Sequence, residues 1–478
     1  MKVLLIEPCY SYRSLGFMEA SRNEPLALES VAASISNRHD IELLDMRIDS
    51  DLEGIITTFQ PDVVALTAYT TQVYIAREIL RKVKEINPTI MTVVGGIHAT
   101  LCPQDFYNEF IDIIVLGEGE YSFREIIESG ERGTRLAEVK GIIYKENGRF
   151  VRTNRRPLIE NLDELPFPDR RIIKRYKGKY VLFPWGDFAS VYTSRGCTSN
   201  CKFCSVWIVN KKQYRAKSAG RVFEELNQIE ENNIMFSDDN FFADAIRCQE
   251  LYHLIKEKGN KYSFIMVQSG VETILGHPSL IESWRDLSDY FMILVGFESF
   301  ENEQIDSLHK NVSAQQNKEC IEILKQNDVA VFAAFIIDPQ YNECDFERLN
   351  EHLERARINY GQYTVLTPLP GTPFYKARER ELVIRNYELF DCMHSVLPTQ
   401  LPRQDFYRLF AQLYRNLTKS SRTQTAERRR LDKFLVSHEI SSRDIYEEWA
   451  TFRHMIKKIT NPQVFLSTEE GFVLEKPT

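Results

Sequence analysis

The chain has 478 residues and a mass of 55.8 kDa, a length that suggests roughly two to four domains. It is 43% hydrophobic and 27% charged, as ordinary soluble globular proteins are, and its formal net charge of −8 argues against a nucleic-acid binder that works by bulk charge. No apolar run approaches the roughly 18 residues of a membrane span, and the amino terminus is typical of a β-strand rather than a signal peptide. We therefore expect a cytoplasmic protein with no integral membrane segment.

The first 140 residues alternate short apolar runs with helical patterns. The expected strands are 2–7, 41–45, 63–69, 92–94 and 111–116, and the expected helices are 25–36, 52–60 and 74–86. Strands that alternate with helices of this length indicate βαβ units and a parallel sheet. We predict an α/β fold that begins with a doubly wound, Rossmann-like domain over residues 1–140. Its ligands should lie beyond the carboxyl ends of the strands, where Gly-rich segments occur.

Residues 141–189 are expected to form a linker. Two short apolar runs flank Asn147-Gly148, a strong hairpin signal, and Pro166 and Pro168 follow in a rigid connector.

The strand–helix alternation resumes over residues 190–372. Strands are expected at 190–193, 234–236, 264–268, 290–296, 329–337 and 362–367, with helices at 219–231, 245–257, 313–326 and 346–357. About six units in one direction predict a partial (β/α) barrel of the TIM type, with the reaction chamber at the carboxyl ends of its strands.

Residues 373–478 are predicted to be a helical carboxy-terminal region, with helices at 405–417 and 442–456. The Arg-rich run 422–430 is typical of a solvated helical face, and contact with an anionic substrate or partner is the alternative.

Three of the nine cysteines are clustered, as Cys197-x₃-Cys201-x₂-Cys204. The other six are scattered, which does not favour a disulfide scaffold. Structural zinc usually takes four ligands, and no second Cys or His pair lies nearby in the sequence. Three thiolates suit a [4Fe–4S] cluster with one iron left open for a chelating substrate. Zinc and three unrelated core thiols are the alternatives.

The segment Arg195-Gly196-Cys197-x₃-Cys201-x-Phe203-Cys204, placed after a strand, resembles the radical S-adenosylmethionine (SAM) superfamily. The resemblance implies that the three cysteines hold the [4Fe–4S] cluster and that Phe203 packs beside the cluster and the adenine. It also implies that SAM binds the open iron and that one electron cleaves SAM to a 5′-deoxyadenosyl radical. A flavodoxin or ferredoxin is the expected electron donor.

Two further strand ends match motifs of this superfamily. The segment 236–241 resembles the motif after the second barrel strand, where Asp239 would lie near the SAM amino group, although Asp and Asn also suit helix caps. The segment 295–299 resembles the motif after the fourth strand, where Glu298 would contact polar atoms of SAM. A glutamate after four apolar residues would be costly to bury without a partner.

Two other segments are weaker candidates. Gln268 ends a strand and could line the chamber, or it could be a plain polar strand end. The segment 366–372 resembles the superfamily's last-strand motif, but its prolines could simply end the strand.

The amino-terminal domain resembles the cobalamin-binding domain that precedes one radical SAM class. The resemblance rests on segments 67–70, 93–100 and 115–120, which are weak singly and stronger in this order. The residues it places near cobalamin are Thr67, Gly95, Gly96, His98, Gly117 and Glu118. The Asp-x-His-x-x-Gly motif that supplies a lower cobalt ligand is absent, so no such ligand can be named. A vestigial domain without a cofactor is the alternative.

Together these resemblances imply a radical SAM enzyme that uses a [4Fe–4S] cluster, SAM and cobalamin. The implied reaction is methylation of an unactivated carbon of a small-molecule substrate in a biosynthetic pathway, and no catalytic residue can be named. Segments 366–375, 387–391 and 394–399 resemble anaerobic magnesium-protoporphyrin ester cyclases and hopanoid-associated relatives. They favour the alternative of radical oxidation or ring formation on a large apolar or tetrapyrrole-like substrate. A non-catalytic cobalamin or iron–sulfur sensor is a further alternative.

Overall fold

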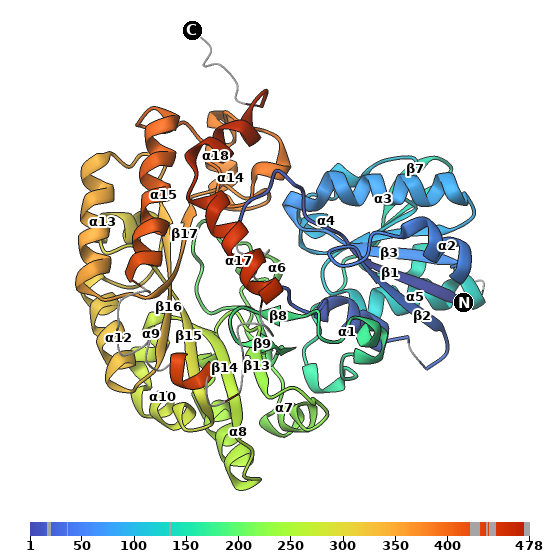
Figure 1. Cartoon of the computed structure of the whole chain (residues 1–478). Helices are drawn as coiled ribbons and strands as arrows, with labels where there is room; N and C mark the ends of the chain where they lie inside the picture. Colours follow the sequence, from blue (N-terminus) through green and yellow to red (C-terminus); the bar gives the residue numbers. More distant parts are fainter. Residues whose placement is uncertain are drawn as a thin grey trace.

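A seven-stranded sheet forms the amino-terminal lobe of the computed structural model, which describes residues 1–16, 21–35, 37–132, 135–420, 431–435, 438 and 446–472 (Figure 1). The strand order is β2-β1-β3-β4-β5-β6-β7. The strands are β1 (Lys2–Glu7), β2 (Asp40–Asp45), β3 (Val63–Thr67), β4 (Met91–Gly95), β5 (Ile113–Val115), β6 (Ile142–Glu146) and β7 (Arg149–Arg152). The first five pair in parallel, and their order places the ligand crevice beyond the carboxyl ends of β1 and β3.

Helices cover both faces of this sheet because each central strand is apolar on both sides. In β1, Val3 and Leu5 belong to the core under α1 (Leu26–Ala33) and α5 (Gly119–Arg132). The alternate residues Leu4 and Ile6 belong to the core under α2 (Leu52–Phe59) and α3 (Val73–Ile86). The predicted doubly wound arrangement is confirmed.

The hairpin predicted around Asn147-Gly148 is present, and both residues have positive φ values of 49° and 77°. Its strands β6 and β7 pair antiparallel with β5 and with each other, so the first sheet continues to Arg152. The first part of the expected linker therefore extends the amino-terminal sheet instead of standing apart from it.

The second lobe is built on six parallel strands in the order β10-β13-β14-β15-β16-β17. They are β10 (Ala189–Val191), β13 (Asn233–Phe236), β14 (Tyr262–Ser269), β15 (Ser288–Glu298), β16 (Ala330–Ile337) and β17 (Tyr360–Val365). The helices between them are α7 (Ala219–Leu226), α8 (Ala245–Glu257), α9 (Val271–Gly276), α10 (Pro278–Arg285), α11 (Asn302–Ser307), α12 (Ala314–Gln326) and α13 (Glu343–Arg355). The predicted partial barrel is confirmed.

The barrel strands alternate between an outer and an inner face. In β14, Ile265 and Val267 join the core beneath the helices. Phe264 and Met266 point the opposite way and pack with Trp185 inside the barrel. The lumen is therefore apolar as well, a property that matters for the site described below.

The carboxy-terminal region is helical, as predicted, with α14 (Pro373–Arg378), α15 (Arg403–Ser420), α17 (Tyr446–Ile459) and α18 (Pro462–Glu469). Helix α17 lies between the barrel and the amino-terminal lobe (Figure 1). The Arg-rich run 422–430 and residues 442–445 of the expected helix 442–456 lie outside the described residues.

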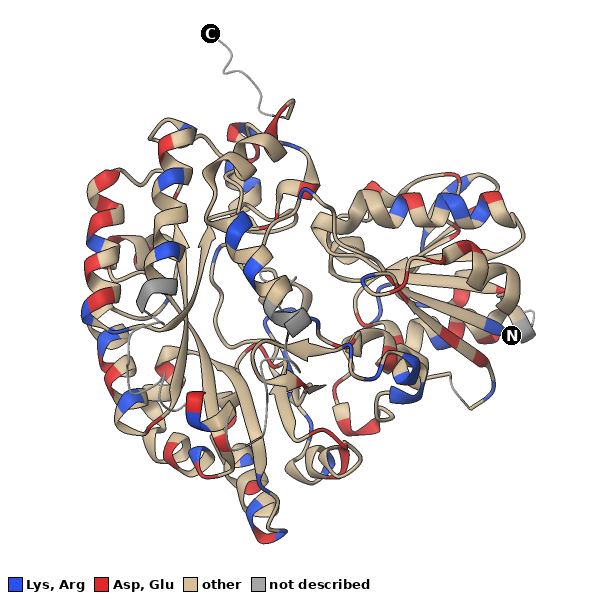
Figure 2. Cartoon of the chain, viewed as in Figure 1, with Lys and Arg blue, Asp and Glu red and all other residues tan. Residues whose placement is uncertain are grey.

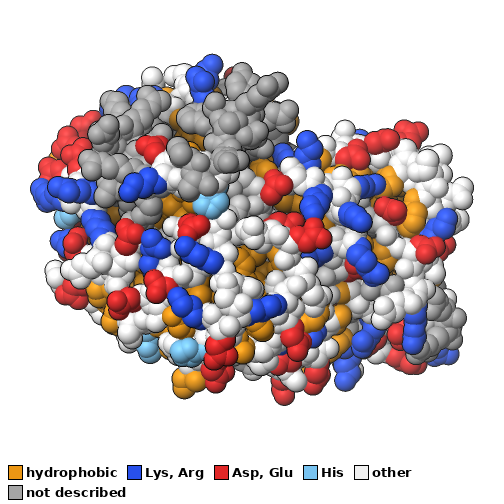
Figure 3. Space-filling view, turned by 60° about the horizontal axis from the view of Figure 1, so that its bottom comes forward, with side chains coloured by type: hydrophobic (Ala, Val, Ile, Leu, Met, Phe, Trp, Pro, Cys, Tyr) orange, Lys and Arg blue, Asp and Glu red, His pale blue; other side chains and the backbone are white. Residues whose placement is uncertain are grey.

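Within the described part of the chain, no helix combines the length and apolar character needed to cross a bilayer. On the face shown in Figure 3, acidic and basic side chains are interspersed over both lobes.

Candidate active site between the two lobes

The clustered cysteines follow β11 (Ser194–Arg195) at the carboxyl end of the first barrel strand. Cys201 is buried, and Cys197 and Cys204 are half-buried. Gly196 starts the loop with φ +93°, and a Cβ there would lie 2.1 Å from the carbonyl oxygen of Gln213, so only glycine fits. The backbone conformation at the start of the cysteine loop therefore depends on the glycine of the Arg-Gly-Cys sequence.

The three thiols do not form a site for a single ion. Among the described residues, the one group of three candidate ligands whose atoms all lie within 4.8 Å of one another is His98, Cys102 and Asp105. Four sulfurs around zinc at about 2.3 Å would stand about 4 Å apart. The wider spacing of Cys197, Cys201 and Cys204 suits a cluster of several irons.

Burial raises the pKa of the Cys201 thiol and raises that of Cys204 to about 12. The protein alone thus keeps both thiols protonated, and bound iron must supply the positive charge that holds them as thiolates.

Phe203 packs against a small apolar cluster beside the cysteine loop. Its neighbours there are Leu308, Ile336 and Leu366, and Phe374 adjoins them. Leu366 belongs to the predicted last-strand motif, so that segment forms a wall next to Phe203. Gln268, in contrast, is exposed at the end of β14.

The two aspartates after β13 have different surroundings. Asp238 is buried and accepts hydrogen bonds from the Thr193 N–H and hydroxyl at 3.1 and 2.7 Å, which gives it a structural role. Asp239 accepts the N–H of Gly196 at 3.3 Å and lies close enough to Cys204 to affect its pKa. Burial raises the pKa of Asp239 to about 6. Asp239, the residue that the sequence predicted, is therefore the aspartate that is hydrogen-bonded to the cysteine loop.

Glu298 lies at a bulge that ends β15. Its φ of +63° is strained for a residue with a side chain, at a cost of about 1–2 kcal/mol. The ammonium of Lys310 lies 2.6 Å from its carboxylate and also donates to the carbonyl of Gly296. Both groups act electrostatically on Cys201. Lys310 is thus the charge partner that Glu298 requires. No sequence motif identified Lys310 in advance.

The predicted cobalamin residues sit at strand ends of the first sheet. Thr67 ends β3 beside Gly95 of β4. A Cβ on Gly96 would lie 2.4 Å from the Thr67 hydroxyl, which explains the glycine and its φ of +95°. At Gly117, by contrast, nothing lies within 4 Å of where a Cβ would be. Open space at this strand end fits a large planar ligand.

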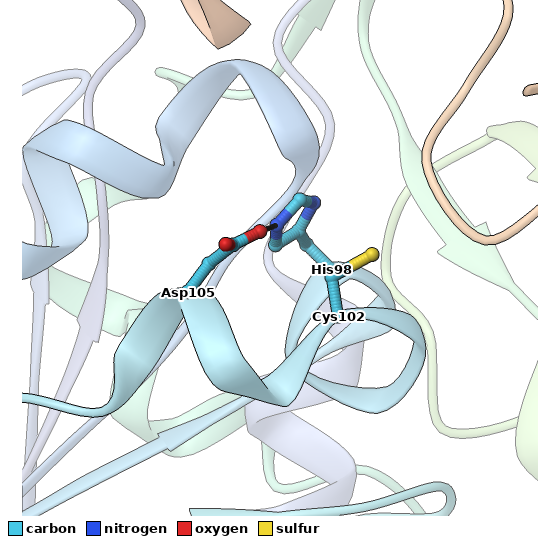
Figure 4. Close-up of side chains that lie close together, drawn as sticks. All are labelled: His98, Cys102 and Asp105. Carbon is cyan, nitrogen blue, oxygen red and sulfur yellow. Dashed lines mark hydrogen bonds and ion pairs between the residues drawn. The ribbon is translucent and has the colours of Figure 1, made fainter. Parts of the chain in front are cut away.

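His98 points into the lobe and is 1% exposed (Figure 4). Its Nδ1 lies 3.1 Å from the Thr70 hydroxyl, and its Nε2 lies 3.0 Å from the Asp105 carboxylate. Figure 4 shows the thiol of Cys102 beside the ring. Because both ring nitrogens have partners within the lobe, His98 offers no nitrogen to cobalt.

We expect His98→Ala to leave the spectrum of bound hydroxocobalamin in the base-off form unchanged. The same substitution should destabilise the protein by about 2 kcal/mol, since it leaves Thr70 and Asp105 with unmet hydrogen bonds. Absorbance and thermal unfolding measure the two effects. A spectral shift in the variant would assign His98 to cobalt and contradict the geometry.

Glu118 binds across the lobe boundary. Its carboxylate lies 2.7 Å from Arg195 and 2.9 Å from Arg215, and it accepts the N–H of Ile159 at 2.7 Å. Burial alone would raise its pKa, but Arg195, Ile159 and Arg215 hold the pKa below its usual range. The carboxylate of Glu118, a predicted cofactor residue, is thus held in an ion pair with Arg195, which precedes the cysteine loop.

A cavity of about 1190 Å³ connects the two lobes. Thr67 and Tyr69 line it from the first sheet, whereas the other predicted cobalamin residues do not border it. Its barrel side consists mainly of lumen residues: Trp185, Met235, Met266, Met292, Leu294 and Phe332. The chamber therefore reaches from the carboxyl end of the first sheet into the apolar barrel lumen, whereas Cys197, Cys201 and Cys204 do not border it.

Residues 20–127 match a family described as the B12 binding domain, and residues 191–353 match the radical SAM superfamily. A hopanoid C-3 methylase of Methylococcus capsulatus is 31% identical over 418 residues, which cover 85% of this chain and 78% of that protein. The chain belongs to the cobalamin-dependent radical SAM enzymes. The cofactors of this family are a [4Fe–4S] cluster, SAM and cobalamin, so the predicted cofactors and enzymatic nature are confirmed.

Other relatives of this radical SAM enzyme differ in their named reactions. An uncharacterized methyltransferase of Pyrococcus horikoshii is 30% identical over 83% of this chain and 88% of that protein. An anaerobic magnesium-protoporphyrin IX monomethyl ester cyclase of Rubrivivax gelatinosus is 28% identical over 83% of this chain and 73% of that protein.

Solved structures confirm the fold. The cobalamin-dependent SAM radical enzyme OxsB aligns with a TM-score of 0.68 and 16% identity, over 99% of this chain and 82% of OxsB. The radical SAM methyltransferase TsrM of Kitasatospora setae aligns with a TM-score of 0.60 and 14% identity, over 79% of this chain and 76% of TsrM.

Proposed function

We propose that this enzyme transfers a methyl group, by way of cobalamin, to an unactivated carbon of a small molecule with a large apolar body. The single observation that carries the proposal is the chamber of about 1190 Å³, which Thr67 borders on the cobalamin side and the apolar barrel lumen on the other. A methyl carrier and a hydrogen-abstracting site must share one substrate, and a shared chamber allows this.

Cys197, Cys201 and Cys204 would hold the [4Fe–4S] cluster, with Phe203 packed beside it. Thr67, Gly95, Gly96 and Gly117 would surround cobalamin, since glycine backbones let a flat ligand approach closely. When bound, the three cofactors supply a 5′-deoxyadenosyl radical that removes hydrogen from the substrate and a methyl group for the resulting carbon radical. The protein contributes position and shielding.

Asp239 and Glu298 would orient the polar atoms of SAM. Asp239 accepts the Gly196 N–H at the start of the cysteine loop, and the Glu298–Lys310 pair acts electrostatically on Cys201 of the same loop. The ammonium of Lys310 lies 2.6 Å from the Glu298 carboxylate and offsets its charge. Asp239, with a pKa raised by burial to about 6, is ionised at neutral pH and can accept from the ammonium of SAM.

The apolar lumen would keep water from the radical. Met235, Met266, Met292 and Leu294 face the chamber, and none of these side chains carries an O–H or N–H group that would hold water. Exclusion of water by closely packed apolar walls limits side reactions of a reactive intermediate.

The chamber and the relatives together favour a polycyclic or similarly large hydrocarbon body. The similar methylase acts, by its name, on hopanoids, and the chamber's walls are mostly apolar. The 28% identity to a cyclase supports the second candidate, radical oxidation or ring formation on the same kind of substrate.

Methyl transfer should consume two molecules of SAM per product, one appearing as S-adenosylhomocysteine and one as 5′-deoxyadenosine, because methyl and radical come from separate cleavages. The test uses anaerobically reconstituted enzyme, a chemical reductant in place of the flavodoxin or ferredoxin that we propose as donor, and lipid extracts with methyl-labelled SAM. Chromatography of both adenosyl products and of labelled lipid gives the ratio. Product with 5′-deoxyadenosine but no matching S-adenosylhomocysteine would establish the cyclase-type reaction instead.

A further inference from the structure

Five side chains that line the chamber are carboxylic acids or strong bases. They are Glu7, Glu24, Arg47, Arg453 and Lys457.

The charges of the three amino-terminal side chains, Glu7, Glu24 and Arg47, are reduced or balanced within the protein. Glu24 accepts from Arg170 at 2.5 Å, and Arg47 pairs with Asp45 at 2.6 Å. Burial raises the pKa of Glu7 to about 7, which makes this carboxyl about half neutral at pH 7. This end of the chamber therefore presents little net charge to a ligand.

Arg453 and Lys457 differ because they have no ion pair or hydrogen bond with any residue that the structure describes. They lie one turn apart on α17, both are exposed, and His454 also lines the chamber. Figure 2 shows the basic bands of α17 between the two lobes. Within the described part of the chain, these two side chains form a basic strip at the chamber's edge without an acidic partner.

The rest of α17 is anchored, which fixes where this strip points. Met455 and Ile459 are buried, and Phe452 stacks on Phe183 with ring centroids 4.5 Å apart. Residues 453, 454 and 457 lie on the opposite face of the same turns. The basic side chains are therefore held at the edge of the apolar chamber by packing on the opposite side of the helix.

We propose that the basic strip of α17 binds an anionic head group, a carboxylate or a phosphate, of a substrate whose apolar body lies in the barrel lumen. This inference rests on the proposed function for the presence of a substrate and deepens it by naming the substrate class, an anionic amphipath. Opposite charge at the edge of an apolar chamber orients such a molecule as well as attracting it, since only one end can face the strip.

The test measures binding, so it does not depend on turnover. Reconstituted holoenzyme is titrated by calorimetry at low ionic strength with hexadecanoate, hexadecyl phosphate and hexadecan-1-ol, each below its micelle concentration. We expect one or both anionic probes to bind about fivefold or more tightly than the alcohol, the range that two exposed ion pairs give. Which of the two binds better distinguishes carboxylate from phosphate recognition.

Arg453→Gln/Lys457→Gln should abolish the preference and leave alcohol binding unchanged, and Arg453→Glu/Lys457→Glu should reverse it. Lys318→Gln/Lys376→Gln, which removes two exposed charges outside the chamber lining, is the matched control and should retain the preference. Equal binding of all three probes by the wild type, or a preference that survives the double Gln substitution, overturns the inference. A failed two-SAM stoichiometry would overturn the methyl-transfer proposal and leave this binding result intact.

Discussion

Replacing Cys197, Cys201 and Cys204 together with alanine is expected to abolish the visible iron–sulfur absorbance and all SAM cleavage. These thiols follow β11, and Asp239 and the Lys310-paired Glu298 both act on this loop, through the Gly196 N–H and through the charge near Cys201. Among the described residues, the one group of ligand atoms close enough for a single ion is His98, Cys102 and Asp105, which contains only one thiol. The loss should therefore be complete, and 5′-deoxyadenosine should fall to background.

The control for this experiment is Cys344→Ala, which removes an exposed thiol from α13. It should retain iron content, absorbance and SAM cleavage at the wild-type level. A triple variant that still binds four irons per chain would show that the cluster lies elsewhere and would remove the basis of the assigned site.

The sequence predicted the two sheets well because parallel strands buried on both faces are continuous apolar runs. The run 264–268 marked β14, and the helical pattern 245–257 matched α8 residue for residue. Strand ends were predicted for the same reason, since Gly96 and Gly196 interrupt the pattern where the backbone must adopt positive φ.

The sequence did not predict which polar groups meet, because those partners are far apart along the chain. Lys310, in a loop after α11, forms an ion pair with Glu298, and Arg215 forms one with Glu118, which is 97 residues away in the sequence. His98 looked like a cofactor residue by its place after two glycines, but the turn of α4 (Ile97–Leu101) directs it inward to Asp105. Spacing within one segment carries no information on such pairings.

The sequence also did not predict the position of α17. Its helical pattern was visible, but its place over the barrel depends on the packing of Phe452 on Phe183, which is about 270 residues earlier in the chain. Only the folded chain shows that Arg453 and Lys457 border the chamber.

Glu118→Gln is expected to lower the stability of the cofactor-free protein by about 3 kcal/mol, the cost of removing one partner from a largely buried ion pair. Its carboxylate joins the cobalamin lobe to both Arg195 and Arg215 of the barrel lobe, and the side chain of Arg215 is 7% exposed. Glu230→Gln breaks an exposed pair with Lys177 and should cost less than about 1 kcal/mol. Thermal unfolding of the two variants and the wild type measures the difference.

The ion pairs of Glu118 also make the stability loss of Glu118→Gln depend on pH. Arg195, Ile159 and Arg215 hold the pKa of Glu118 below its usual range in spite of burial. A carboxyl with a lowered pKa in the folded state stabilises the protein above its unfolded-state pKa, and this stabilisation is lost as the pH falls through the folded-state value. The gap in melting temperature between wild type and Glu118→Gln should therefore be full near pH 7 and narrow below about pH 4. If Glu118 instead served cobalamin directly, the cofactor-free variant would melt like the wild type at every pH, and only its cobalamin affinity would fall.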